Sequence, residues 1–431
     1  MNQHPTSIRF VRLALILTAA FCLTIAGITP LGVSTASAEK ILKVGSIGPF
    51  TGPAARVGQE FKNSIEMAFD KIGWTIGDYK VEFVWIDSES DAEKAAKAYE
   101  RAIVRDKINV GFNTWHSWVS ASCMEVAAKY KIPHFFSFGA GKIMNEKYAS
   151  DPDRYKYWVG KTWPLPEKLS IGYINALEEA IEKGIWKPEN KKVAVYGVDN
   201  DWGRAFGSAV KKQFQDAGWS VATEEYVQLG ETEFYPLLSK IKRKKVSVAV
   251  GSMSDPPSVS AFIKQAREVG LKSMILSDGL GWVGEWYNLT GDASDYVLDQ
   301  IPQWTTPRAL KFRDEFNTRY GFDPGASSAG LCYDTAGFFI KVLQTTLKDY
   351  GELTREAFVK CAVEQVIPGK LTYTDGLLME EYKYTPETFP DPVVGKGYYI
   401  FPVIQYFGGK GTIIWPEEWK SADIKVPDNM K

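Results

Sequence analysis

Two histidines are the first side chains to weigh, because histidine is the commonest general base in enzymes. Beyond residue 38 the chain contains only His116 and His134. The sequence has no G-x-S-x-G serine elbow and no G-x-x-x-x-G-K-[ST] phosphate loop. Its cysteines and histidines never occur at metal-ligand spacing. The sequence therefore predicts no catalytic residue and no metal site.

One glycine motif matches a cofactor-binding pattern. Residues 279–284 read G-L-G-W-V-G after an expected strand, and Asp299 follows Gly279 by 20 positions, as a ribose-binding acid does. The motif lies late in the chain, however, and Trp282 crowds the turn that a pyrophosphate needs. We expect a glycine-rich loop at a cleft, and no cofactor.

Aromatic side chains make up 13% of the chain, and several fall in loops between expected elements. Such rings offer large contact areas, and tryptophan adds one polar group, which suits a pocket that closes around a small organic molecule. The alternative is that these rings pack within the core or between lobes. The loop aromatics are Phe50, Trp115, Trp118, Phe138, Trp202 and Trp282.

Short apolar runs alternate with helical patterns along most of the chain, which predicts mostly parallel sheets covered on both faces. The first series of elements runs from about residue 41 to residue 138, and the second from 192 to 277. Expected strands lie at 41–48, 80–86, 108–112, 132–138, 192–197, 219–227, 246–251, 273–277 and 296–301. One expected helix follows the first Gly/Pro turn and carries Phe61, Ile65, Ala68 and Ile72 on one face. Further helices are expected at 91–106, 118–130, 204–217, 234–244, 258–269, 308–320, 328–350 and 354–364. After Leu371 the chain reads as β-like, ending in a hairpin of 398–407 and 412–415 around Gly408-Gly409.

In parallel α/β sheets, ligands bind beyond the carboxyl ends of the strands. The loops expected at such a site are 48–56, 113–117, 137–142, 198–203, 251–257 and 277–284.

The first 38 residues read as a cleaved signal peptide. Arg9 and Arg12 precede an apolar stretch, and Ala36 and Ala38 fit the small-residue cleavage rule. We therefore expect an exported protein that does not span the membrane after processing. Cleavage leaves 49 basic residues against 52 acidic ones, which argues against a nucleic-acid partner. The remaining length suits two lobes with a cleft between them.

Three cysteines remain after cleavage, so one disulfide at most can form within the chain. Cys332 and Cys361 are the pair to test, with two buried thiols as the alternative, and Cys123 is left over.

Four motifs, in order, carry a family resemblance. They are Val44 to Pro53 followed by Gly58, Asp199 to Gly203, Gln265 to Leu271, and Tyr333-Asp334. From about residue 40 onward the chain resembles the leucine/isoleucine/valine-binding proteins of ABC importers.

This resemblance implies an α/β fold of two Rossmann-like lobes joined by three crossovers, that of the type I periplasmic binding proteins. Lobe one is then expected at 39–161 plus 304–370, and lobe two at 162–303 plus 371–431. The implied protein is a periplasmic monomer that closes by hinge motion over a small ligand. It delivers that ligand to an ABC permease and its ATPase subunits.

The resemblance also implies site residues. A ligand carboxylate is expected at two loops, formed by Trp115, His116 and Ser117 and by Ser137, Phe138, Gly139 and Ala140. Trp202 is expected to face the ligand. In the family an acid holds the ligand ammonium, and Asp278 lies one position from the place that aligns with that acid. Arg56 or His116 could supply positive charge, and Val57 stands where the family has an aromatic residue. Trp282 and Tyr333 complete the expected set.

The class of ligand stays open at this point. An amino acid or close derivative needs both the carboxylate loops and Asp278, and the family favours it. An aromatic acid or amide uses the tryptophans instead of Asp278. A sensor that takes no part in transport and an exported hydrolase are the other functions considered.

Overall fold

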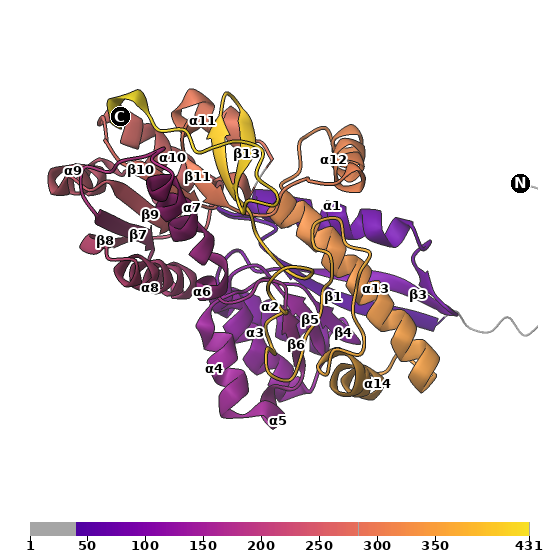
Figure 1. Cartoon of the computed structure of the whole chain (residues 1–431). Coiled ribbons are helices and arrows are strands. Elements are labelled where there is room, and N and C mark those ends of the chain that lie inside the picture. Colours follow the sequence, from indigo (N-terminus) through magenta and orange to yellow (C-terminus); the bar gives the residue numbers. More distant parts are fainter. Residues whose placement is uncertain (1–39, 283, 431) are drawn as a thin grey trace, which may run out of the picture. The chain divides into compact units, whose positions relative to one another are not determined.

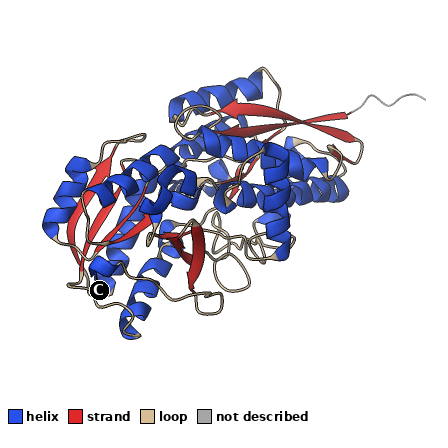
Figure 2. Cartoon of the chain, turned by 90° about the horizontal axis from the view of Figure 1, so that it is seen from above, coloured by secondary structure: helices blue, strands red, loops and turns tan. Residues whose placement is uncertain are grey.

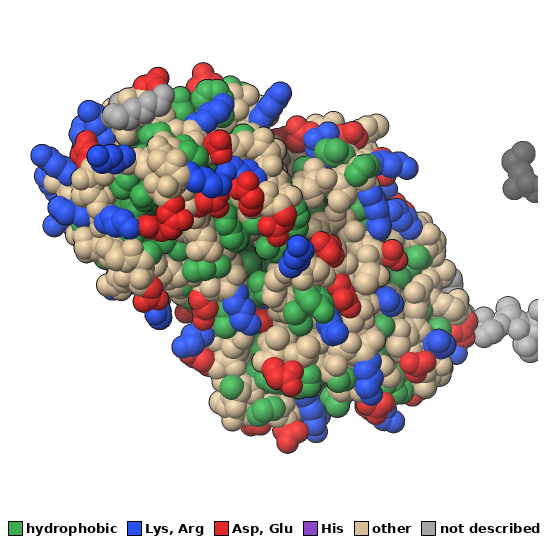
Figure 3. Space-filling model, viewed as in Figure 1, with side chains coloured by type: hydrophobic (Ala, Val, Ile, Leu, Met, Phe, Trp, Pro, Cys, Tyr) green, Lys and Arg blue, Asp and Glu red, His purple; other side chains and the backbone are tan. Residues whose placement is uncertain are grey.

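The computed structural model describes residues 40–282 and 284–430. The predicted signal peptide lies outside this range. Within it, none of the helices combines the length and the apolar character that crossing a membrane requires. On the face shown in Figure 3, Lys and Arg side chains are interspersed with Asp and Glu.

Six strands form the first sheet, called sheet A, in the order β2-β3-β1-β4-β5-β6. All neighbours are parallel except β2, which pairs antiparallel at the edge. Buried β-branched and aromatic residues such as Val44 and Phe112 make these runs suitable for a sheet covered on both faces. The strands are β1 (Lys40–Gly48), β2 (Thr75–Ile76), β3 (Tyr79–Asp87), β4 (Val110–Phe112), β5 (His134–Ser137) and β6 (Trp158–Lys161).

Seven strands form sheet B in the order β13-β12-β11-β10-β9-β7-β8. Strands β12 and β13 are antiparallel and form the expected terminal hairpin, in which Gly408 and Gly409 both have positive φ. The strands are β7 (Lys192–Val198), β8 (Ser220–Val227), β9 (Val248–Ser252), β10 (Met274–Asp278), β11 (Leu298–Gln300), β12 (Val403–Phe407) and β13 (Lys410–Trp415). Two largely parallel sheets with helices against them confirm the predicted α/β class (Figures 1 and 2).

Helices pack on both faces of sheet A. Ile47 and Ile86 belong to a cluster with α2 and α3, whereas Leu42 and Val44 belong to a cluster with α1 and α13, because successive strand residues point to opposite faces. The helices are α1 (Ala55–Asp70), α2 (Ala92–Val104), α3 (Ser117–Tyr130), α4 (Lys142–Ser150), α5 (Pro152–Tyr155), α6 (Pro166–Leu169), α7 (Ile171–Glu182), α8 (Asp201–Asp216), α9 (Tyr235–Lys244), α10 (Pro256–Glu268), α11 (Trp286–Thr290), α12 (Pro307–Tyr320), α13 (Leu331–Tyr350) and α14 (Arg355–Cys361). Short π-helical turns, Ala326–Gly330 and Ala362–Val366, adjoin α13 and α14.

The segment 371–402 differs from its β-like expectation. It contains only two isolated bridges, Tyr373 with Tyr382 and Val394 with Tyr399. Its aromatic side chains pack onto other elements instead of pairing as strands, and Tyr384, for example, stacks on Phe136 of β5. The expected lobe boundaries stay a prediction.

The disulfide suggested for Cys332 and Cys361 is not formed. Both thiols are buried and free, as is Cys123. Cys332 Sγ lies 3.7 Å from the carbonyl oxygen of Phe61 and 3.7 Å from Nδ2 of Asn113, so its neighbours are polar groups of other elements.

Candidate functional site

A small cavity lies where the loops of sheet A meet those of sheet B. The unfilled space between its walls, including the part that is open to solvent, is about 330 Å³. Its lining residues follow strand ends: β4 and β5 on one side, β7, β9 and β10 on the other, with one more residue after β6. They are Trp115, His116, Ser117, Phe138, Ala140, Trp163, Trp202, Ser254 and Trp282.

Edge-to-face contacts fix the tryptophan walls. The ring centroid of Trp282 lies 5.5 Å from that of Trp115 and 6.5 Å from that of Trp163. The ring centroids of Trp163 and Trp202 are 6.3 Å apart, and the rings of all three pairs are nearly perpendicular. This geometry is favourable for aromatic pairs. The four rings contact one another edge to face and give the cavity apolar walls.

Three hydrogen-bonding groups of the lining residues have no partner in the described part of the chain. The indole N–H groups of Trp163 and Trp282 and the hydroxyl of Ser254 are buried and unpaired among the described residues. Buried donors are rarely left unpaired, because each costs about 1–3 kcal/mol. These three groups belong to residues that line the same cavity.

The N-terminus of α3 also favours a negatively charged ligand group. Ser117 is both the first residue of α3 and a cavity residue, and no side chain caps this helix. By contrast, Asn200 caps α8 and Asp255 caps α10, with bonds of 2.9 Å each. Unpaired N–H groups and the helix dipole favour an anion at such an end.

His116 is neutral in this environment. Burial lowers its pKa to about 3, and its Nε2 lies 3.0 Å from Oγ of Ser90. None of the described lining residues carries a formal charge. The site can therefore hold an anion only through neutral donors.

Contacts within the protein occupy both ring nitrogens and one ring face of His134. Its ring stacks on Trp158 at 4.1 Å, and its nitrogens lie 3.0 Å from Tyr99 Oη and 2.8 Å from the Asn113 carbonyl oxygen. Burial lowers its pKa to about 3, so it is neutral as well. Within residues 40–282 and 284–430, no cluster of three His, Cys, Asp or Glu side chains is arranged to hold a metal.

The structure brings seven of the sequence-predicted residues together at the cavity. They are Trp115, His116, Ser117, Phe138, Ala140, Trp202 and Trp282. Five others lie outside the lining. Two of these belong to the second expected loop: Ser137 Oγ accepts the indole N–H of Trp158 at 3.1 Å, and Gly139 packs against Ser120.

Arg56 and Tyr333 lie apart from the cavity lining. Arg56 forms an ion pair of 2.9 Å with Glu285, and its guanidinium carbon lies 3.4 Å from the ring centre of Phe322. Tyr333 packs on Phe312 at 4.6 Å and accepts a hydrogen bond from Lys71. Neither side chain reaches the site expected for it.

Asp278 is buried behind the wall. It accepts the hydroxyl hydrogen of Ser252 at 2.8 Å, and Ser252 in turn accepts the indole N–H of Trp202 at 2.8 Å. Burial and the nearby Asp299 carboxylate raise the pKa of Asp278 well above its usual range. Trp202 lines the cavity and bonds to the Ser252 hydroxyl that Asp278 holds, whereas Asp278 is not among the lining residues.

The glycine motif has an internal explanation. Asp299 accepts the backbone N–H of Gly281 at 2.9 Å and of Gly279 at 3.4 Å, and the hydroxyl of Tyr406 at 2.9 Å. The acid that matched a ribose-binding position therefore shapes the loop that carries Trp282.

Sequence reasoning missed Trp163 and Ser254. Ser254 lies within the predicted loop 251–257, so the loop was identified but its serine was not singled out. Trp163 lies in the Trp-Pro-Leu-Pro stretch that joins the two series of elements, and that connecting position was the available signal.

Two α/β sheets whose loops enclose a small aromatic cavity define a solute-binding architecture. The family model described as a periplasmic binding protein matches residues 41–375, and the chain belongs to this family. The resemblance inferred from the sequence is thus confirmed. The family and the neighbours below are binding proteins.

One relative is the Leu/Ile/Val-binding protein homolog 8 of Brucella abortus (strain 2308). It is 23% identical over 297 residues, covering 66% of this chain and 71% of that protein. A solved solute-binding protein of an ABC transporter from Rhodopseudomonas palustris BisB5, in complex with 3,4-dihydroxybenzoic acid, has a TM-score of 0.71 and 22% identity, covering 90% of this chain and 99% of that one. A leucine-binding protein from Thermotoga maritima MSB8 has a TM-score of 0.67 and 19% identity, covering 86% and 97%. These structures share the fold.

Proposed function

We propose that the protein is an extracytoplasmic receptor that binds a small planar aromatic carboxylate and delivers it to an ABC importer. Family membership supports the receptor role, and the permease and its ATPase subunits are the partners. Closure over the ligand shifts an equilibrium between open and closed forms, and the closed form docks on the permease.

The observation that carries the ligand class is the set of three unpaired donors on tryptophan walls. The indole N–H groups of Trp163 and Trp282 and the Ser254 hydroxyl can donate to carboxylate oxygens. The flat faces of the same rings suit a planar apolar body. The solved Rhodopseudomonas palustris protein, whose ligand is 3,4-dihydroxybenzoic acid, gives this class a precedent in the same fold.

An amino acid fits the cavity less well. Its ammonium group needs a carboxylate, and Asp278, the acid expected for this role, is covered by Ser252 and Trp202. A buried ammonium without an acceptor carries a large desolvation penalty. For this reason the aromatic acid takes precedence over the amino acid favoured from the sequence.

Thermal unfolding and calorimetry of the mature protein test the proposal. The ligand set is benzoate, 4-hydroxybenzoate and 3,4-dihydroxybenzoate against leucine, valine and phenylalanine, with benzamide as a neutral match for benzoate. A ligand at 100 times its Kd stabilises the folded protein by about 2.7 kcal/mol. We expect this effect with at least one aromatic acid and not with benzamide. Stabilisation by an amino acid alone would overturn the ligand class.

A further inference from the structure

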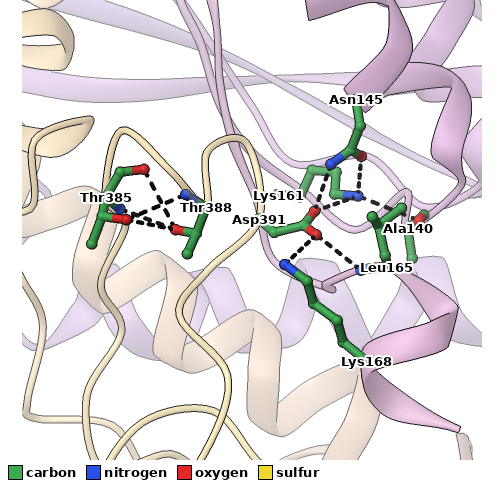
Figure 4. Close-up of polar contacts among 8 residues, drawn as sticks. All are labelled: Ala140, Asn145, Lys161, Leu165, Lys168, Thr385, Thr388 and Asp391. Carbon is green, nitrogen blue, oxygen red and sulfur yellow. Dashed lines mark hydrogen bonds and ion pairs between the residues drawn. The ribbon is translucent and has the colours of Figure 1, made fainter. Parts of the chain in front are cut away.

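A fully buried carboxylate, Asp391, joins three elements around the cavity. Its Oδ1 accepts from Lys161 Nζ at 2.6 Å and from Asn145 Nδ2 at 3.2 Å. Its Oδ2 accepts from the backbone N–H of Leu165 at 3.3 Å and lies 3.2 Å from Lys168 Nζ. These partners come from α4, the end of β6 and the start of α6 (Figure 4).

Lys161 extends this contact to the cavity wall. Its ammonium group is also fully buried, and it donates to Asn145 Oδ1 at 2.7 Å and to the carbonyl oxygen of Ala140 at 3.3 Å. Ala140 lines the cavity. The ion pair therefore lies directly behind one cavity wall.

Asp391 contacts the chain on both sides of Trp163. On one side of this residue, the Lys161 side chain binds Asp391 and its backbone N–H donates to the Pro390 carbonyl oxygen at 2.8 Å. On the other side, the N–H of Leu165 donates to Asp391. Both ends of the five-residue stretch that carries Trp163 are thus tied to residues 390 and 391.

Asp391 is itself held by a local turn. Its backbone N–H donates to the Thr388 carbonyl oxygen at 2.9 Å, and the backbone N–H of Thr388 donates to Thr385 Oγ1 at 3.2 Å. Figure 4 shows this turn beside the Asp391 cluster. This turn therefore holds the backbone of Asp391, from which the carboxylate projects.

Stability alone does not account for this ion pair. Burial by itself raises the pKa of Asp391, but Lys161, Lys168 and Asn145 hold it below its usual value, so the carboxylate is charged. Buried ion pairs are often no more stabilising than apolar side chains of similar volume. The charged groups fix the orientation of the carboxylate and its partners, because each oxygen accepts hydrogen bonds from particular donors.

We propose that Asp391 is a positioning residue for the cavity. Through Lys161 and Leu165 it fixes the Ala140 wall and the Trp163 indole in the arrangement that receives the ligand. Its effect on affinity rests on the proposed function, whereas its effect on the Trp163 indole does not.

Asp334 offers a matched control. It is a second fully buried carboxylate that holds the same irregular segment, and it accepts from the N–H groups of Leu377 and Leu378 and from the Tyr382 hydroxyl at 2.6, 3.1 and 2.6 Å. None of these residues lines the cavity. Asp334→Asn therefore perturbs the segment without touching the proposed anchor.

The test compares Asp391→Asn, Asp334→Asn and wild type in the mature protein. Indole N–H signals in ¹H–¹⁵N spectra are recorded without ligand, and Trp163→Phe assigns the Trp163 signal. Benzoate affinity is then measured by calorimetry. We expect Asp391→Asn to shift the Trp163 signal and to weaken benzoate binding about tenfold, the loss of one good hydrogen bond. Asp334→Asn should leave both unchanged.

A double variant guards against misfolding, because Asp391→Asn leaves the Lys161 charge without its partner. Lys161→Met combined with Asp391→Leu keeps an apolar pair of similar size and should still shift the Trp163 signal. A Trp163 signal and a benzoate affinity equal to wild type in the folded variants would overturn the inference. If the wild type binds no benzoate but Asp391→Asn moves the Trp163 signal, the positioning role stands and the proposed ligand fails.

Discussion

Ser252 accepts the indole N–H of Trp202 at 2.8 Å and donates its own hydroxyl hydrogen to Asp278. This contact uses the only polar group of the Trp202 side chain. Trp163 and Trp282, in contrast, keep their indole N–H groups unpaired among the described residues. Of the four tryptophans that line the cavity, two thus carry an indole N–H without a partner among the described residues, and Trp202 carries one that is bonded to the protein.

Removing these unpaired donors should weaken binding more than it weakens the fold. Trp163→Phe and Trp282→Phe keep an aromatic wall but lose the N–H, and a hydrogen bond to a charged group contributes about 1.5–3 kcal/mol. We expect each variant to bind benzoate at least about tenfold more weakly. Calorimetry gives the affinity, and urea unfolding without ligand gives the free energy of unfolding, which should fall less than in Trp202→Phe because no hydrogen bond within the protein is lost.

Trp202→Phe should show the opposite pattern. It leaves the buried Ser252 oxygen without its donor, so the free energy of unfolding should fall by about 1–3 kcal/mol. Benzoate affinity should change far less than in the other two variants. A large loss of affinity with no loss of stability would contradict the division between the tryptophans.

Benzoate affinity should be independent of pH between 6 and 8. His116 has a pKa of about 3 because of burial, so it stays neutral throughout this range. Calorimetry at pH 6, 7 and 8 checks this expectation. Binding that tightens steadily toward pH 6 would indicate a protonated histidine at the carboxylate.

Glu60 should make stability depend on pH. Burial raises its pKa from 4.5 to about 7, although Ser328 and the N–H of Gly325 lower it. The folded state therefore binds more protons than the unfolded state between these values, and this contribution to stability falls as pH rises from about 4.5 to 7. It is absent at higher pH.

The variant Glu60→Gln isolates that contribution. The free energy of unfolding of wild type relative to Glu60→Gln should fall by about 3 kcal/mol between pH 4.5 and 7.5. Urea unfolding at several pH values measures it, and the difference cancels the opposite contribution of the buried histidines. Parallel pH curves for the two proteins would show that Glu60 titrates normally.

The cysteines should all be thiols. Cys123, Cys332 and Cys361 are buried and unpaired, so an alkylating reagent should label them only after unfolding, without added reductant. Mass spectrometry counts the labels. A mass that shows one label instead of three would indicate a disulfide.

Much of the fold was predictable from short-range patterns. Apolar runs gave most strands, and the predicted helix at 118–130 is α3, Ser117–Tyr130. The sequence reading missed β6, Trp158–Lys161, because a four-residue strand with a glycine and a lysine has little apolar signal. The segment after Leu371 misled, because its aromatic residues are buried against other elements without forming strands.

Most of the cavity residues were also predictable, because loops after parallel strands meet at one edge of a sheet. Trp115, Phe138 and Trp202 followed from that rule. Asp278 did not, because the rule identifies a loop and does not say whether a side chain faces the cavity or lies behind a neighbour.

The sequence by itself determined the α/β class, the family and the loops that approach the ligand, since each depends on patterns within a few consecutive residues. Only the tertiary structure decided which donors stay unpaired, and that Asp391 lies behind Ala140 and Trp163. These contacts join residues up to 230 positions apart, as Lys161 and Asp391 are. Burial and hydrogen-bond pairing depend on every element that packs around a group, and short-range patterns do not record them.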